Sequence, residues 1–79
     1  MYLNLKRIKA ERIAKGYTQE YMAEKMGFNN RSAYAKRENG IVNIGADELA
    51  QIAEILEIPS NQLSIFFTLS VPKRERGVH

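Results

Sequence analysis

The side chains that could take part in chemistry are concentrated in one polar segment, Asn29-Asn30-Arg31-Ser32, which is followed by Lys36 and Arg37. They offer hydrogen-bond donors, hydrogen-bond acceptors and positive charge. The groups that catalysis usually needs are missing from the sequence: it has no cysteine, its one histidine is His79, and no motif pairs two carboxylates. We therefore expect a binding protein and not an enzyme, with no metal ion, no cofactor and no small-molecule ligand.

Charge is divided unevenly along the 79 residues, whose net charge is +3. Residues 1–40 carry nine Lys and Arg against four Glu, whereas residues 41–65 carry four acidic residues and no basic one. A basic half favours a polyanionic partner, although solvated helix faces of opposite sign would give the same distribution. The sequence shows no signal peptide and no membrane span, which predicts a cytoplasmic protein.

Short helices must position these polar groups, because Gly16, Gly27 and Gly40 each follow a segment with apolar residues at helical spacing. Glycine readily adopts the left-handed conformation in which many helices end. The pattern predicts helices over 5–15, over 18–26 and from 29 or 30 to about 39. The Thr18 side chain is suited to cap the second helix, while Asn29 and Asn30 are both suitable caps for the third.

Two more helices are predicted in the second half, one from about Gly45 that stops at Pro59 and a short one from Ser60. Residues 65–71 then alternate as in a half-buried strand, which needs Tyr2 and Leu3 or a second copy as its partner. The expected domain is 1–71, followed by a disordered basic tail over 72–79. The apolar stripes predict core positions in three helices: Leu5, Ile8, Ile13, Met22, Ala23, Met26, Leu49, Ile52, Ala53 and Leu56.

Residues 16–40 carry the most specific pattern in the chain. Thr18-Gln19 opens the second helix, Met22-Ala23 follows, Gly27 makes a turn, and Glu38-Asn39-Gly40 closes the third helix. This segment resembles the helix-turn-helix of lambda-repressor/Cro-type (XRE-like) regulators, and the resemblance extends over roughly residues 5–66. It implies an all-α, five-helix domain in a bacterial or phage protein. It also implies a double-stranded DNA partner and regulation of transcription, as a repressor.

The resemblance also implies roles for individual residues, with the third helix in the major groove. The expected base contacts are Asn30, Arg31, Ser32, Ala35 and Lys36. The expected phosphate contacts are Thr18, Gln19, Asn29, Arg37, Asn39 and Gly40. A structural ion pair is implied between Arg12 and Glu38. One extra residue in the turn leaves the base-contact register open by one residue. Arg37 replaces a large apolar residue, so its stem is expected to cover the core while its head reaches phosphate.

A homodimer is expected, because one small reading helix contacts few base pairs. Six apolar residues exceed what so small a domain easily buries, and they fit either a dimer interface or the monomer core: Ile41, Val42, Ile44, Ile65, Phe66 and Phe67. The alternative function is an antitoxin or another protein-interaction module, which would use the surface of residues 41–67 on a different protein.

Overall fold

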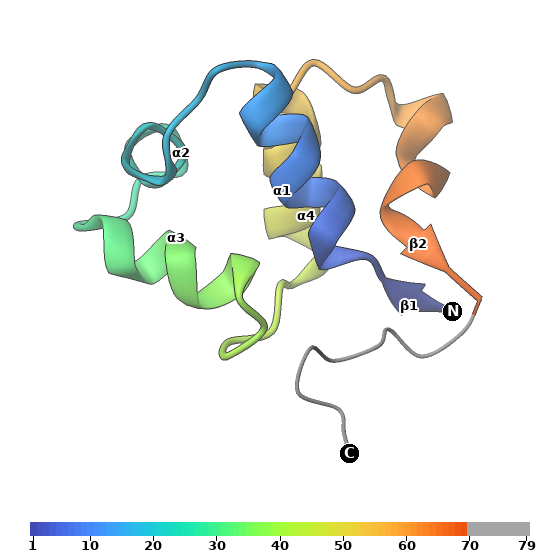
Figure 1. The fold of residues 1–79 in the computed structure, drawn as a ribbon, viewed down its shortest axis with the longest axis horizontal. Coiled ribbons are helices and arrows are strands. Elements are labelled where there is room, and N and C mark those ends of the chain that lie inside the picture. Colours follow the sequence, from blue (N-terminus) through green and yellow to red (C-terminus); the bar gives the residue numbers. More distant parts are fainter. Residues whose placement is uncertain (70–79) are drawn as a thin grey trace.

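The computed structural model describes residues 1–69, which form four α-helices, one 3-10 helix and a two-stranded sheet. The helices α2 and α3 lie at one end of the molecule, η1 and the sheet lie at the other, and α1 and α4 lie between them (Figure 1). The mostly helical fold agrees with the predicted class. In chain order the elements are β1 (Tyr2–Leu3), α1 (Leu5–Ala14), α2 (Gln19–Lys25), α3 (Arg31–Glu38), α4 (Ala46–Ile55), the 3-10 helix η1 (Ser60–Phe66) and β2 (Phe67–Thr68).

The ends of the first three helices follow from local hydrogen bonds. The Thr18 hydroxyl caps α2 by accepting from the Tyr21 N–H at 2.9 Å, and the Asn30 side chain caps α3 by accepting from the Ala33 N–H at 3.0 Å. Asn30, and not Asn29, is therefore the cap of α3. The three glycines that follow α1, α2 and α3 have φ between 78° and 82°, as the sequence predicts.

The end of α4 differs from the prediction. The helix stops at Ile55, and Glu57 takes up the left-handed backbone conformation with φ 60°. This conformation costs an L-residue other than glycine roughly 1 kcal/mol or more. Pro59 is therefore not the residue that terminates the helix, because the chain has already turned before it.

The hydrophobic core joins all five helices, and nine apolar residues are buried in it: Ile8, Met22, Ala23, Met26, Tyr34, Ile52, Ala53, Leu56 and Phe66. Ile13 was predicted to belong to it, but its side chain is 57% exposed. The ambiguous residue Phe66 is fully buried, whereas Ile41 is 73% exposed. The remaining interface candidates are partly buried.

The C-terminal strand is shorter than predicted, because Ile65 and Phe66 belong to η1 and β2 holds two residues. It pairs antiparallel with β1, with Thr68 opposite Tyr2 and Phe67 opposite Leu3. The intrachain partner is thus the one that forms. Val71 and the predicted tail over 72–79 lie outside the described residues. Among the helices of residues 1–69, none has the length and hydropathy to span a membrane.

Candidate nucleic-acid interface

The helices α2 and α3 form a pair that is joined by a short turn. Gly27, with φ 81°, redirects the chain at the end of α2, and the Phe28 N–H donates to the Ala23 carbonyl at 2.9 Å. Phe28 is half-buried and packs against the core, so this residue occupies the turn that the sequence analysis found to be one residue longer than usual. The pair therefore presents α3 at one end of the molecule (Figure 1).

The helix α3 has a buried side and an exposed side. Tyr34, Ala35 and Glu38 are buried, whereas Arg31, Ser32 and Lys36 are exposed. Ala35 was expected among the base contacts, but it does not belong to the exposed side of α3, because its exposed fraction is 8%. With its methyl group mostly covered by the protein, Ala35 is poorly placed to meet a thymine methyl. The two basic side chains on the exposed side remain available to an external partner.

A buried ion pair lies behind the exposed side of α3. The Arg12 guanidinium in α1 donates from Nε to one Glu38 carboxylate oxygen at 2.8 Å and from Nη2 to the other at 3.1 Å. The Tyr34 hydroxyl donates to Glu38 at 2.8 Å, and Arg12 also donates to the Tyr17 carbonyl at 2.7 Å. The structure thus contains the pair that the resemblance implied, and α1 holds the end of α3 through it.

The environment of this pair shifts the pKa values of its members. Burial raises the pKa of Glu38, but hydrogen bonds from Arg12, Tyr34 and Gln19 outweigh it, so the net pKa lies below the ordinary value. Burial, and then the hydrogen bond to Glu38, raises the pKa of the Tyr34 phenol. Glu38 is therefore an ionised acceptor at neutral pH, and Tyr34 is a protonated donor.

Gln19 connects this buried pair to the exposed side of α3. Its amide nitrogen donates to Glu38 at 2.9 Å, and its amide oxygen accepts from Arg31 Nη1 at 2.9 Å. The sequence analysis expected Gln19 to contact phosphate and missed both of these contacts. Its partners are distant in the sequence, because Arg31 lies 12 positions and Glu38 lies 19 positions after Gln19. The orientation of Arg31 is coupled to the buried carboxylate through this one amide.

Arg37 differs from the prediction in what its head contacts. The guanidinium donates from Nε to Glu48 at 3.0 Å and from Nη1 to the Ala33 carbonyl at 2.7 Å, and it lies 4.5 Å from the centre of the Phe28 ring. Glu48 also accepts from the Gly45 N–H at the start of α4. Arg37 therefore joins α3 to α4 instead of extending a free cation toward phosphate.

The other predicted phosphate contacts are exposed at the ends of α2 and α3. Thr18 and Asn29 precede these helices, and Asn39 and Gly40 follow α3. The Thr18 hydroxyl oxygen and the Asn30 amide oxygen already serve as helix caps, whereas the Asn30 amide NH₂ is a donor and takes no part in the cap. A Cβ at Gly40 would lie 3.2 Å from the Leu5 side chain, which makes this residue a contact between α3 and α1 as well.

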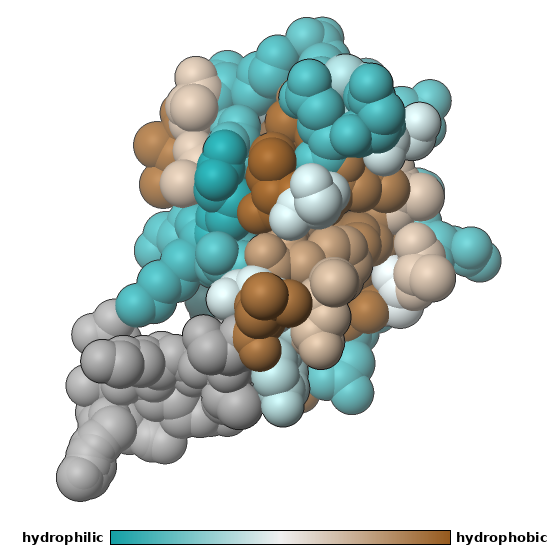
Figure 2. All heavy atoms as spheres, turned by 90° about the vertical axis from the view of Figure 1, so that its right-hand side faces the viewer, coloured by the Kyte–Doolittle hydropathy of each residue, from teal (hydrophilic) through white to brown (hydrophobic). Residues whose placement is uncertain are grey.

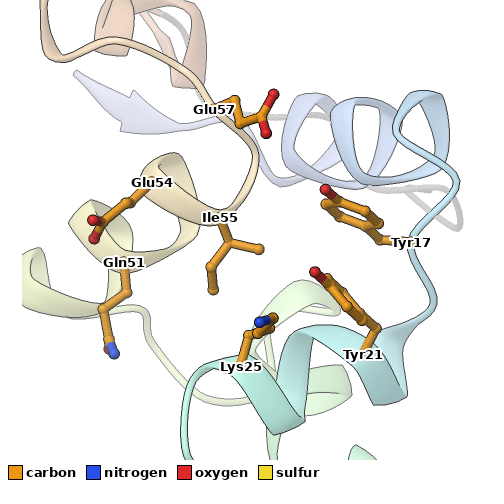
Figure 3. Close-up of a pocket in the computed structure, with 7 residues that line it drawn as sticks. All are labelled: Tyr17, Tyr21, Lys25, Gln51, Glu54, Ile55 and Glu57. Atoms are coloured by element: carbon orange, nitrogen blue, oxygen red, sulfur yellow. The ribbon is translucent and has the colours of Figure 1, made fainter.

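A separate groove with a volume of about 290 Å³ lies between α2 and α4 (Figure 3). The Tyr17 and Tyr21 rings form one wall, with centroids 4.4 Å apart, and the Lys25 ammonium lies 5.6 Å from the Tyr21 centroid. Carboxylates of Glu54 and Glu57 stand on the α4 side (Figure 3). None of the predicted DNA contacts lines this groove. The candidate interface is therefore the exposed side of α3 and not this groove.

The described residues contain no group of three or more His, Cys, Asp or Glu that could hold a metal ion. Residues 8–63 match the model of a protein family described as helix-turn-helix. The match begins inside α1, includes α2 to α4 and ends inside η1. No curated protein and no solved structure matches the chain.

Proposed function

Because the chain belongs to the lambda-repressor-like helix-turn-helix family, whose domain is DNA-binding and typical of transcriptional regulators, we propose that it is a sequence-specific repressor that reads the major groove with α3. The observation that carries this proposal is the two-sided α3. Its inner side is held by buried hydrogen bonds, and its outer side offers Arg31, Ser32 and Lys36 to a partner. Repression follows if the bound domain occupies DNA that other proteins need.

Base reading is assigned to the exposed side of α3. The Arg31 guanidinium has the geometry to donate to O6 and N7 of a guanine, while Ser32, Lys36 and the Asn30 amide offer groups for neighbouring base edges. Gln19 acts as a positioning residue, because it holds Arg31 Nη1 at 2.9 Å. We leave Ala35 and Arg37 out of the contact set, since the first is buried and the second is bonded to Glu48.

Phosphate contacts are proposed at the helix ends that flank α3, where Thr18, Asn29, Asn39 and Gly40 are exposed. They would fix the position of α3 without reading sequence. A homodimer is proposed because a helix of eight residues spans few base pairs. Two copies would read half-sites about 34 to 36 Å apart.

The test is selection of duplexes from a random-sequence pool by the wild type and by the Arg31→Ala/Lys36→Ala variant, at two salt concentrations. We expect a palindromic motif with the wild type and its loss with the variant. Each lost bidentate base contact costs about 1–3 kcal/mol of discrimination. Wild-type affinity should fall as salt rises, because phosphate contacts release counterions.

A matched control removes two positive charges elsewhere. Lys15→Ala/Lys25→Ala lowers the net charge equally, at residues whose contacts are with Glu57 and Tyr21 beside the groove of Figure 3. The control should select the same motif as the wild type. If the wild type enriches no sequence and shows no salt-dependent binding, the proposal is wrong. An interaction module such as an antitoxin then becomes the better description.

A further inference from the structure

The groove between α2 and α4 takes no part in the proposed reading of DNA, because none of the proposed DNA contacts lines it. On the side of η1 and β2, by contrast, apolar atoms form a broad area (Figure 2). The lining of the groove includes two carboxylates and one ammonium, so it attracts a cation more than a phosphate. Its volume of about 290 Å³ is just below the range of about 300–1,000 Å³ that is usual for small-molecule pockets. One long side chain from another molecule therefore fits this space better than a drug-sized ligand.

The wall on the α2 side is aromatic and fixed in place. The Tyr17 and Tyr21 rings are partly buried and pack against the core. Two hydrogen bonds hold the Tyr17 backbone, because its N–H donates to the Arg12 carbonyl at 3.1 Å and its carbonyl accepts from the Arg12 side chain at 2.7 Å. Both phenol rings point across the groove toward the α4 side (Figure 3). A ligand therefore meets a wall that is already formed, which lowers the entropy cost of binding.

Aromatic rings in this fold already hold cations. The Lys25 ammonium lies 5.6 Å from the centre of the Tyr21 ring in the groove itself. Elsewhere, the Arg37 guanidinium lies 4.5 Å from the centre of the Phe28 ring and donates to Glu48 at 3.0 Å. One ring and one carboxylate thus hold an arginine side chain. The groove offers the same two kinds of group, but no described arginine lines it.

The groove also contains a carboxylate at an unusual backbone position. The residue that follows the C-cap of α1, α2 and α3 is a glycine with positive φ, whereas after α4 it is Glu57, with φ 60°. The ion pair of Glu57 with Lys15 is exposed, and exposed pairs contribute little to stability. A carboxylate kept where the backbone favours glycine indicates a use beyond folding. Lys15 donates to Oε1 of Glu57, which leaves Oε2 to accept from a ligand.

We infer that this groove binds an arginine side chain displayed on the surface of another protein. The guanidinium lies against the Tyr17 and Tyr21 rings and donates to Glu57, while the aliphatic stem contacts Ile55. The Glu54 carboxylate has no hydrogen-bond or ion-pair partner among the described residues and adds a second negative charge. Arginine suits the site better than lysine, because its planar group stacks on rings and forms several directed hydrogen bonds. Tyrosine and arginine are also enriched at protein interfaces.

The test is a titration of the ¹⁵N-labelled full chain, followed by NMR. The probe is a seven-residue glycine peptide with blocked ends and one central arginine. We expect saturable shifts of the backbone amides of Tyr17, Tyr21 and Glu57, with binding that weakens as salt rises. A peptide with citrulline in place of arginine keeps the shape and loses the charge, so it should cause no such shifts. A peptide with lysine should bind more weakly than the arginine peptide.

Single substitutions locate the binding. Glu57→Gln should weaken binding of the arginine peptide about threefold, the effect typical of one exposed charge pair. Glu24→Gln is the matched control, since it removes the same charge from an exposed residue of α2 that does not line the groove. Lys25→Ala should tighten binding by a similar factor, because its ammonium no longer competes for the Tyr21 ring. Tyr21→Leu keeps an apolar side chain, removes the ring and should weaken binding. Circular dichroism verifies that each variant is folded.

Arg74 and Arg76 of the same chain are a second source of arginine. The Arg74→Gln/Arg76→Gln variant should leave the resonances of Tyr17 and Tyr21 unchanged in the free protein, and it should bind the peptide like the wild type. Changed resonances together with tighter peptide binding would assign the groove to the chain's own C-terminal segment and overturn the inference.

Other results would overturn it too. They are the absence of saturable shifts at millimolar peptide, shifts confined to residues outside the groove, equal binding of the citrulline or lysine peptide, and equal effects of Glu57→Gln and Glu24→Gln. This inference does not rest on the proposed function. A chain that binds the peptide but selects no duplex leaves the groove assignment standing while the DNA-binding proposal fails, and the reverse result does the opposite.

Discussion

Two of the ion pairs that connect separate helices have nearly equal distances but lie in different surroundings. The Arg12–Glu38 pair beneath α3 spans 2.8 Å, and its side chains are 9% and 1% exposed. The Lys15–Glu57 pair, at the ends of α1 and α4, spans 2.7 Å, with side chains that are 34% and 69% exposed. Breaking a buried pair leaves a charge that water cannot reach, whereas water replaces the partner in an exposed pair. Burial therefore sets the consequence of losing a partner, and distance does not.

The two carboxylates also differ in how many groups depend on them. Glu38 accepts from Arg12, Tyr34 and Gln19, and through Gln19 it is connected to Arg31. Glu57 accepts from Lys15 across the surface. Loss of Glu38 therefore affects the position of α3. Loss of Glu57 removes only the surface ion pair between the ends of α1 and α4.

The largest expected effect comes from Glu38→Gln. It leaves the Arg12 charge buried without its counter-ion, which should lower the free energy of unfolding by about 3 kcal/mol or more. Urea denaturation should show a lower midpoint at an unchanged slope. Glu57→Gln is the control, and its midpoint should stay near that of the wild type. Equal losses in the two variants would contradict the role of burial.

Acid should selectively remove the stabilisation that Glu38 provides. Its folded-state pKa is lower than the ordinary value of 4.5, so protons bind more tightly to the unfolded chain. The stabilisation is complete above about pH 4.5 and is lost as the pH falls through the folded-state pKa. The stability difference between wild type and Glu38→Gln should therefore shrink below pH 4.5 in denaturation curves. A constant difference from pH 7 to pH 3 would argue against an ionised Glu38.

A smaller effect is expected for Tyr34→Phe, which removes one donor to Glu38 and keeps the ring in the core. The expected loss is about 1 kcal/mol, the usual value for one buried hydrogen bond, and corresponds to roughly 4–8 °C in Tm for a domain of this size. Differential scanning calorimetry measures it. A Tm equal to the wild type would show that the hydroxyl contributes nothing to the cluster.

Gln19→Ala should separate positioning from stability. It removes one of several hydrogen bonds to Glu38, so the expected stability loss is about 1 kcal/mol or less. Affinity for the selected duplex should fall further than this loss explains, because Arg31 loses the acceptor that orients it. Fluorescence anisotropy with a labelled duplex, recorded at a temperature where the variant is fully folded, measures the affinity. Unchanged affinity would remove Gln19 from the reading surface.

The smallest effect on stability is expected for Glu57→Gly, and any change should be a gain and not a loss. Glycine adopts φ 60° without the strain of a side chain, so relief of the backbone should offset the lost surface ion pair. Tm should stay the same or rise slightly. Ala35→Gly, at a buried helical position without this strain, should lower it. A lower Tm for Glu57→Gly would mean that the exposed pair matters more than its surroundings suggest.

Much of the architecture could be read from local sequence signals. Thr18, Asn30 and the three glycines act through hydrogen bonds and backbone conformations a few residues away, so their roles as helix ends are visible in the chain itself. The end of α4 escaped this reasoning because Glu57 holds a conformation that favours glycine. The strand over 65–71 was overestimated because alternation cannot distinguish a short strand from a 3-10 helix that packs Phe66 inside.

The candidate site was less predictable, because the side chains of α3 have partners on distant elements. The sequence by itself determined that a short capped helix carries Arg31, Ser32 and Lys36, since spacing and caps are local properties. Only the tertiary structure decided that Ala35 faces inward, that Arg37 bonds to Glu48 and that Gln19 joins Arg31 to Glu38. Each of these outcomes depends on which neighbouring helix covers a given face, and packing of residues far apart in the chain sets that.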